Sequence, residues 1–464
     1  MEENLVQAGR WAALNFGGAE LGDRRSTRRL VEVATRLVAE PTGSLHRALP
    51  TWSELVGAYR LLGRPKTNFD AVARPHQKRT QAACREAGDY LLIEDTTSLD
   101  FTSHEATKGL GRIGDDGGRG LHLHSNLALR IESWSAGGPL CSVVGFFHQK
   151  CWARTTQTIG FGNEPKRKRL KRPRESMRWA EAYESSDAPP PGTRWTHVGD
   201  RETDIYEAFE RCEAKGFDWL VRACQARALA DNAGSVFSAV AAAEPVGRVD
   251  LELRARPGQL ARTAHLSVRT ASVRLRSPWR PGRSRDELST HVVEVREEAP
   301  PPGADALCWV LLTSWPAATF EEALRVVGAY ACRPIIEEFH RSLKSGVTNV
   351  EESQLKTANA LRALTAILSP IALKMLDLRA EVLCHPEARL KPGAVPPLAL
   401  QLLAKRLGHP VQDWTWLAFT LALAQLGGFK ARASDGLPGW NTLWRGWHKL
   451  MIMMEGVELF SGSG

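Results

Sequence analysis

Residues 90–96, YLLIEDT, and residues 195–200, WTHVGD, decide the fold of this chain. Each is a run of strand length, mostly apolar, that contains an acid at its polar end, Asp95 in the first run and Asp200 in the second. A strand that emerges from a core can present a carboxylate at its end. We therefore expect two strands of one sheet, each with an acid where the strand ends.

The neighbouring stretches predict a mixed sheet that is covered by helices. Further apolar runs of strand length occur at 121–131 and 141–148, separated by Gly-rich or polar turns. A helical stretch at 204–216 and another strand at 218–224 follow the second acid. Alternating strands and helices are typical of α/β folds.

Residues 226–306 differ from the sequence around them. Apolar residues alternate there with Arg in a period of two, which predicts antiparallel strands with one apolar and one basic face. A buried strand is expected at 308–314 and a long helix at 319–346, which Pro334 should kink or divide. The segment therefore reads as a β-rich insertion.

The two ends of the chain are expected to be helical. Residues 1–78 include the stretch 21–38, in which Leu30, Val33, Ala34 and Leu37 share one helical face. The part from about residue 376 is rich in Trp, with Trp440, Trp444 and Trp447 on one face of a helix. This aromatic stripe fits either core packing within the chain or a dimer contact.

Length and composition restrict the class of protein. A chain of 464 residues is long enough for two to four domains, and 61 Lys and Arg against 52 Asp and Glu favour a polyanionic partner. The eight Cys include no C-x-x-C pair, which predicts reduced thiols rather than a zinc site. Because the N-terminus lacks a signal peptide and the apolar stretch 414–429 is short, we expect a cytoplasmic protein without a membrane span.

Basic residues gather at two places. Arg24, Arg25, Arg28 and Arg29 lie at the start of an expected helix, where cations oppose the helix dipole and suggest an external phosphate. A solvated helix face is the alternative. The basic run at 166–174 could bind target or flanking DNA, and a solvated loop explains it equally well.

The acids suggest a chemistry. Asp95, Asp200 and one acid from a helix would supply the hard oxygen ligands that Mg²⁺ prefers, and two such ions can drive phosphoryl transfer. Spacing alone does not choose between Glu337 and Glu338 as the third acid. Each Asp taken singly can also be explained as a residue that caps the following turn.

At this point the sequence resembles a known family, the DDE transposases of bacterial insertion sequences, in the branch typified by the transposon-five transposase. Its Y-(2)-R-(3)-E-(6)-K signature is matched at every interval by Tyr330, Arg333, Glu337 and Lys344. The stretches 91–99, 199–206 and 175–179 resemble further motifs of this branch. The resemblance selects Glu337 over Glu338.

The resemblance implies an RNase H-like catalytic core at 79–375 with the β-rich insertion at 226–306. It also implies a helical domain at 1–78 that binds double-stranded transposon ends and a helical dimerisation domain at 376–464. Such enzymes nick DNA, form and reopen a hairpin, and join the 3′-hydroxyl to target DNA. The implied cofactor is Mg²⁺, two ions per active site bound by Asp95, Asp200 and Glu337, with Mn²⁺ as a substitute. The implied setting is the bacterial nucleoid.

Contacts to DNA also follow from the resemblance. Trp309 falls where the family has a base-stacking Trp. Lys344 resembles the family's lysine that contacts the end of the transposon strand. Phosphate contacts are implied for Tyr330, Arg333 and Arg222, and Arg25 and Arg29 are our candidates in the N-terminal domain. The sequence departs from the family at Cys224 and Pro334, which replace a basic and an aromatic residue, so these local contacts are less secure than the metal ligands.

Two other functions use the same features. An RNase H-like DNA endonuclease would need the three acids without strand transfer, but Trp309 and the four-residue signature argue against it. A non-catalytic DNA-binding repressor derived from a transposase would not need the acids, all three of which are present.

Overall fold

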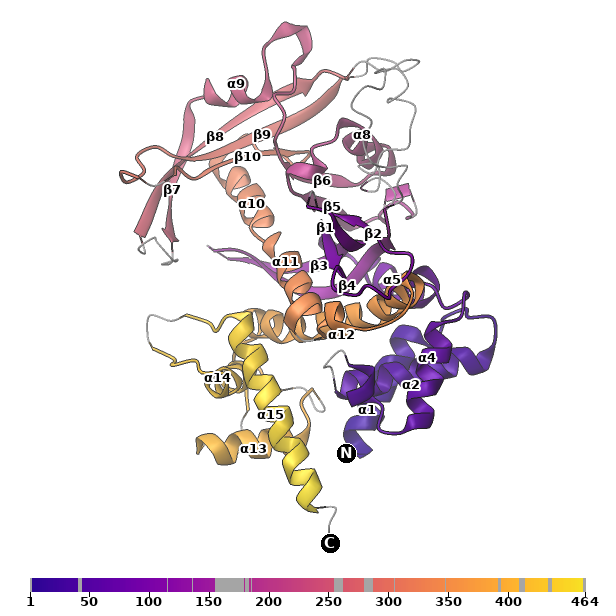
Figure 1. The fold of residues 1–464 in the computed structure, drawn as a ribbon. Coiled ribbons are helices and arrows are strands. Elements are labelled where there is room, and N and C mark those ends of the chain that lie inside the picture. The colour runs from indigo at the N-terminus through magenta and orange to yellow at the C-terminus, as the bar shows by residue number, and fades with distance from the viewer. Residues whose placement is uncertain are drawn as a thin grey trace.

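The computed structural model describes residues 2–40, 44–114, 116–135, 137–154, 179, 183–184, 186–253, 262–278, 287–303, 305–346, 348–390, 394–408, 414–432 and 436–461. Within these residues the chain is a mixed α/β protein with a large mixed sheet and N-terminal helices. Figure 1 shows the long helix α12 (Ala358–Cys384) running beneath the sheet, with the N-terminal and C-terminal helices below it. The basic run at 166–174 lies outside the described residues.

The N-terminal helices form where local signals start them. They are α1 (Glu2–Phe16), α2 (Arg24–Ala39), α3 (Leu45–Ala48), α4 (Trp52–Leu62) and α5 (Phe69–Ala83). Asp23 caps α2, and Thr51 with Glu54 forms a capping box on α4. The expected apolar face of α2 is confirmed, since all four of its predicted residues are buried.

The first half of the sheet combines antiparallel and parallel strands. Its strands are β1 (Gly88–Asp100), β2 (Gly111–Ile113), β3 (Gly118–Ser135), β4 (Gly138–Trp152), β5 (Thr193–Gly199) and β6 (Asp218–Arg222). β3 pairs antiparallel with β4 and β1, and β5 pairs parallel with β1 and β6. This mixed sheet confirms the expected pattern of strands.

The expected insertion extends the same sheet. β7 (Pro245–Leu253), β8 (Arg262–Leu275) and β9 (Leu288–Glu297) are antiparallel, and β10 (Cys308–Thr313) joins β9 to β6. The short helix α9 (Val236–Ala241) precedes them. Cross-strand ion pairs join Arg262 to Glu297 and Arg269 to Glu294, so this part of the basic face is neutralised within the sheet.

Both faces of the central strand β1 are buried over its first half. Alternate residues of β1 point to opposite sides, with Leu91 and Ile93 in one apolar cluster and Tyr90 and Leu92 in the other. Helices α5 and α12 pack against β4 on the first side, and α8 (Tyr206–Lys215) belongs to the second. The two faces of β1 therefore hold different environments, which matters for its acidic residues.

Pro334 divides the expected long helix. The chain forms α10 (Phe320–Tyr330), and Pro334 then starts α11 (Pro334–Arg341), which continues into a π-helical turn, η5 (Ser342–Gly346). Because proline lacks an N–H, it fits the first position of a helix better than its interior. Helix α11 packs against β1 and leads from α10 toward α12 (Figure 1).

The remaining helices are α13 (Pro397–Leu407), α14 (Trp416–Leu426) and α15 (Trp440–Ser461). Trp444 and Trp447 pack against the larger core cluster, whereas the side chain of Trp440 lies outside the described residues. In the described part of the chain, no helix combines the length and apolarity needed to cross a membrane. The helices α5 and α12 continue across residues 78 and 375, and the expected division into domains stays a prediction.

Candidate functional site

Asp95 and Asp200 lie next to each other at one edge of the parallel strands. The parallel pairing of β1 with β5 ends at Ile93 opposite Val198, and each acid follows two residues later. Equal offsets in a parallel pair place both acids at the same level of the sheet. The register therefore brings two carboxylates together that are far apart in sequence.

The expectation that Asp95 ends its strand is wrong. β1 continues to Asp100, since residues 90–100 pair with β3 and Asp95 lies opposite Ser125. Asp95 is nevertheless placed where β1 loses its partner on the other side, β5. Strand length is set by the longer partner, which the apolar run alone does not reveal.

Asp200 does follow the end of its strand, and it also caps the next turn. Its Oδ1 accepts a hydrogen bond of 2.8 Å from the backbone N–H of Glu202 at the start of η3 (Arg201–Thr203). Its Oδ2 lies 3.4 Å from Arg333 Nη2. The two interpretations of this residue are compatible, because each uses a different oxygen of the carboxylate.

Arg333 connects both aspartates to Glu337. Its Nη2 lies 3.3 Å from Asp95 Oδ1 and 3.4 Å from Asp200 Oδ2, and its Nη1 donates a hydrogen bond to Glu337 Oε1. Glu337 is in the first turn of α11, one helical turn after Arg333. The three acids from β1, the β5–η3 junction and α11 thus face one guanidinium. Among the described residues, no three or more His, Cys, Asp or Glu side chains form a ready-made metal-binding group.

The environment affects the two aspartates in opposite directions. Burial acts to raise the pKa of Asp95, but His340 and the Arg333 guanidinium outweigh it and hold that pKa below its usual value. Burial raises the pKa of Asp200 above its usual value despite the neighbouring Arg333. Burial opposes the charge on Arg333, yet the carboxylates raise its pKa. The ionised form of Asp95 is therefore favoured, whereas Asp200 next to it is easier to protonate.

His340 is a member of this site that the sequence interpretation missed. Its Nδ1 lies 3.6 Å from Asp95 Oδ2 and its side chain is buried. Within the described ranges of the chain, its buried Nε2 has no hydrogen-bond partner. His340 lies three residues after Glu337 on α11, so both residues share one helical face. That spacing was the signal in the sequence that could have identified it.

Glu94 forms a second polar cluster on the opposite face of β1. Its carboxylate is fully buried and accepts hydrogen bonds from Asn126 Nδ2 at 2.8 Å and Tyr183 Oη at 3.4 Å. It also forms a hydrogen bond with His197 Nδ1, and His124 Nε2 lies 4.0 Å away. This cluster joins β1, β3 and β5 directly behind the two aspartates, and the sequence interpretation missed it.

The Glu94–His197 pair is expected to make stability depend on pH. Burial raises the pKa of Glu94 well above 4.5 and lowers that of His197 well below 6.5, so the folded pair holds one proton. The unfolded pair holds two protons below pH 4.5, one in between and none above pH 6.5. The contribution to the free energy of unfolding therefore falls on both sides of this window, by about 1.4 kcal/mol per pH unit.

Glu94→Gln tests this expectation by urea unfolding followed by circular dichroism. Above pH 6.5, unfolding of the wild-type protein releases the proton that the folded Glu94–His197 pair holds. The Gln side chain has no such proton, so the wild-type protein should lose stability relative to the variant as the pH rises above 6.5. Glu86→Gln, which changes an exposed carboxylate paired with Arg130, should keep the wild-type slope. Parallel slopes for wild type and Glu94→Gln would contradict a shared proton.

Three of the expected DNA-contact residues lie together beside the acids. Trp309 on β10 is half-buried and packs edge-on against Tyr330 at the end of α10, with ring centroids 5.3 Å apart. Arg222 at the end of β6 donates a hydrogen bond of 3.1 Å to the Cys308 carbonyl. Burial raises the pKa of Tyr330, while the nearby Arg333 and Arg222 act to lower it. Tyr330 is thus close to both Arg333 and Trp309. The role of these side chains toward DNA stays a prediction.

Lys344 lies in the π-helical turn at the end of α11. Its Nζ is 3.4 Å from Glu351 Oε1, and the same oxygen accepts a hydrogen bond of 2.8 Å from the Asp100 N–H. Lys344 is therefore next to the end of β1, five residues beyond Asp95. Its expected contact to a DNA strand end stays a prediction.

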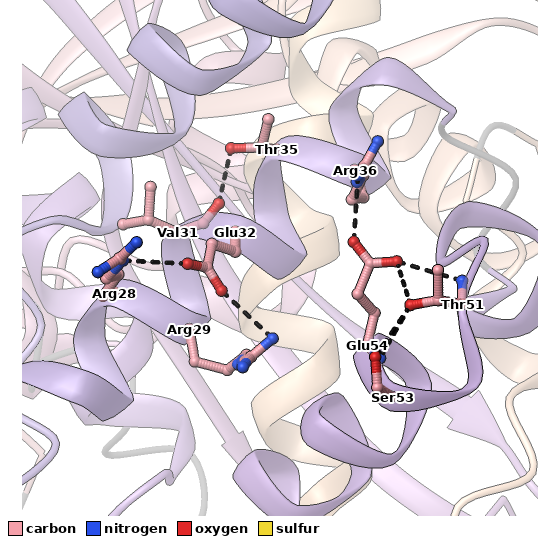
Figure 2. Close-up of polar contacts among 9 residues, drawn as sticks. All are labelled: Arg28, Arg29, Val31, Glu32, Thr35, Arg36, Thr51, Ser53 and Glu54. Atoms are coloured by element: carbon pink, nitrogen blue, oxygen red, sulfur yellow. Dashed lines mark hydrogen bonds and ion pairs between the residues drawn. The ribbon is translucent and has the colours of Figure 1, made fainter.

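The basic residues of α2 are engaged to different degrees (Figure 2). Glu32 forms ion pairs with Arg28 at 3.2 Å and Arg29 at 3.3 Å, and Glu54 forms one with Arg36 at 3.1 Å. The Glu54 carboxylate also holds the N-terminus of α4 through Thr51. Arg36 therefore ties α2 to α4, whereas Arg28 and Arg29 stand at the surface.

A comparison with known families bears on these helices. Residues 8–67 match the family model described as transposase DNA-binding. The chain carries a transposase DNA-binding domain. The match begins within α1 and ends between α4 and α5, so it contains the charged helix α2 completely.

The match to this domain indicates that the protein binds DNA. Within it, Arg25 is exposed at the start of α2, and in the described part of the chain it forms no ion pair. Arg29 is half-exposed and shares Glu32 with Arg28. A phosphate would thus meet Arg25 directly but would compete with Glu32 for Arg29.

Proposed function

We propose that this protein is a cut-and-paste DNA transposase with an RNase H-like catalytic core. The observation that carries the proposal is the convergence of Asp95, Asp200 and Glu337 on Arg333, in a chain with a transposase DNA-binding domain. The sheet supports it, because the antiparallel strands β4, β3 and β1 continue into the parallel strands β5 and β6. Asp95 and Asp200 each follow the last parallel pair of β1 and β5 by two residues, which is the expected position for such a site.

Asp95, Asp200 and Glu337 fit the Mg²⁺ or Mn²⁺ that this reaction class uses. All three offer hard carboxylate oxygens within reach of one cationic group, which is the donor chemistry of these ions. Two such ions, when bound, activate a water or a 3′-hydroxyl and stabilise the leaving oxygen. The protein orients these donors through backbone contacts: Asp95 accepts the Thr96 N–H at 2.9 Å and Asp200 accepts the Glu202 N–H at 2.8 Å.

The aromatic pair beside the acids fits the hairpin step. A hairpin at the transposon end strains the DNA backbone, and flipping a base out of the stack relieves that strain. Trp309 offers an aromatic face that Tyr330 supports from its edge, and stacking on it would contribute about 1–3 kcal/mol. Tyr330, Arg222 and Arg333 would then contact phosphates next to the flipped base.

Concerted cutting requires both transposon ends in one complex. We infer a homodimer in which the C-terminal helices α13, α14 and α15 provide the contact. The exposed apolar residues Ile452 and Phe460 near the end of α15 support this assignment. The N-terminal domain of each copy would hold one end.

The proposal is tested with purified protein, Mg²⁺ and DNA that carries the inverted repeats flanking the gene. We expect excision through nicked and hairpin intermediates, followed by joining of 3′ ends to a target plasmid. Trp309→Ala should keep nicking while the hairpin yield falls roughly tenfold, as expected for a lost stacking energy of about 1–3 kcal/mol. Cutting without joining would favour the endonuclease, and end binding without cutting would favour the repressor.

A further inference from the structure

The position of Arg333 is unusual for a residue that serves only to contact DNA. Its side chain is 14% exposed and its guanidinium lies among three carboxylates. The pair with Glu337 is a local one within four residues, whereas Asp200 is 133 residues away in sequence. An ordinary ion pair on a helix surface would involve Glu337 alone. The additional contacts to Asp95 and Asp200 place the guanidinium at the centre of the candidate catalytic site.

The hydrogen bonding of Arg333 is incomplete in this position. Its two terminal nitrogens point to Asp95, Asp200 and Glu337, but its Nε is buried and has no acceptor among the residues that the structure describes. A buried donor without a partner destabilises the arrangement that contains it. The guanidinium is therefore held by charge, and a ligand that offers acceptors to the whole guanidinium face would compete for it.

A divalent ion that binds the carboxylate oxygens facing Arg333 would lie close to the guanidinium. Arg333 Nη2 contacts one oxygen of Asp95 and one of Asp200, and these are the oxygens that face the centre of the site. The second oxygen of Asp95 faces His340, and the second oxygen of Asp200 caps η3. A divalent ion at this centre would meet the like charge of the guanidinium at close range.

We propose that Arg333 is the cation that neutralises Asp95, Asp200 and Glu337 in the DNA-free protein and excludes divalent metal ions until a DNA phosphate withdraws it. A phosphate offers the planar guanidinium a bidentate, charge-assisted contact, which is the interaction that arginine makes best. DNA binding would thereby open the metal site. This inference rests on the proposed function and adds a regulation of the same three acids.

The coupling must act in both directions. If a phosphate that binds Arg333 raises the affinity for metal, bound metal raises the affinity for DNA by the same factor. The arginine would also offset the mutual repulsion of the three carboxylates before the substrate arrives.

Binding of Mn²⁺ to the DNA-free protein tests the proposal without any measurement of activity. Free Mn²⁺ is followed by electron paramagnetic resonance during a titration of wild type, Arg333→Gln and Arg333→Lys. We expect Arg333→Gln to bind Mn²⁺ at least tenfold more tightly than wild type, because the competing charge is gone. Arg333→Lys keeps one charge but cannot reach all three acids at once, so its affinity should lie in between.

Arg341→Gln is the matched control. Arg341 lies on the same helix and is exposed, and its Nε lies 3.5 Å from the Glu337 carbonyl oxygen. Within the described part of the chain it pairs with no carboxylate, so the variant removes an equal charge near the site. Its Mn²⁺ affinity should remain within about twofold of wild type, since an exposed charge is screened. Circular dichroism of each variant verifies that the fold is retained.

The outcomes separate the inference from the function on which it rests. Equal Mn²⁺ affinity of wild type and Arg333→Gln, abolished in both by Asp200→Asn, would contradict the exclusion by Arg333 and leave the metal site intact. Absence of Mn²⁺ binding in every protein would contradict the metal site itself. If Arg341→Gln raised the Mn²⁺ affinity as much as Arg333→Gln, the change in net charge would explain the effect, and the proposal would be overturned.

Discussion

Asp200→Asn is expected to abolish DNA cleavage while the protein still binds transposon ends. The amide retains the oxygen that caps η3 but loses the charge that faces the centre of the site. Loss of one ligand to a catalytic metal removes several kcal/mol of transition-state stabilisation, so cleavage should fall roughly 10³-fold. Asp95→Asn should behave alike, because it keeps the acceptor for the Thr96 N–H.

The third acid has a matched control in its neighbour. Glu337→Gln should lose cleavage to a similar extent, since Glu337 contacts Arg333 in the site. Glu338→Gln should stay within a few-fold of wild type. Cleavage is measured on radiolabelled end DNA, and binding is measured by gel shift with the same DNA. Full cleavage by Asp200→Asn would reject the catalytic assignment, and the opposite result for the two glutamates would reassign the third acid to Glu338.

Gly446→Ala is expected to destabilise the C-terminal helices strongly. A Cβ at Gly446 would lie 1.8 Å from the carbonyl oxygen of Leu423, and one at Gly427 would lie 1.9 Å from that of Thr442. The backbones of α14 and α15 therefore touch, and a methyl group must push them apart. Overpacking against backbone costs about 1–3 kcal/mol or more, which thermal unfolding followed by circular dichroism would detect.

Gly456→Ala provides the control in the same helix. Apart from the nearby backbone of its own helix, no atom of the described residues lies within 4 Å of the position that its Cβ would take. The main change is therefore the better helix propensity of Ala. It should stabilise α15 by roughly 0.5–1 kcal/mol. The two substitutions are thus expected to shift the melting temperature in opposite directions. A stabilising Gly446→Ala would show that the two helices do not pack this closely.

Local features of the fold were predictable because neighbours in sequence determine them. The apolar face of α2 follows from helical spacing, and the strands β7, β8 and β9 follow from alternation. Pro334 predicted a break in the long helix, and it starts α11. Arg333 and Glu337 are four residues apart, which places them on one helical face.

Other features depend on which strands pair and in which register. Asp95 lies within its strand because β3 pairs with β1 well beyond it, and no local pattern near residue 95 records the length of β3. Glu94 alternates with Asp95 and points to the opposite face, where only the pairing of β1 with β3 and β5 reveals Asn126 and His197. A lone Glu in an apolar run gives no sign of such partners.

The sequence by itself determined the apolar face of α2, the alternating strands of the insertion, the candidate acids and, through spacing, the four-residue signature. Only the tertiary structure decided that three acids from β1, the end of β5 and α11 meet at Arg333, with His340 beside Asp95. The physical reason is the range of the interactions. The spacing of apolar residues determines structure over a few residues. The contacts between β1, β5 and α11 instead arise from the register of the sheet and from the packing of α11 against β1.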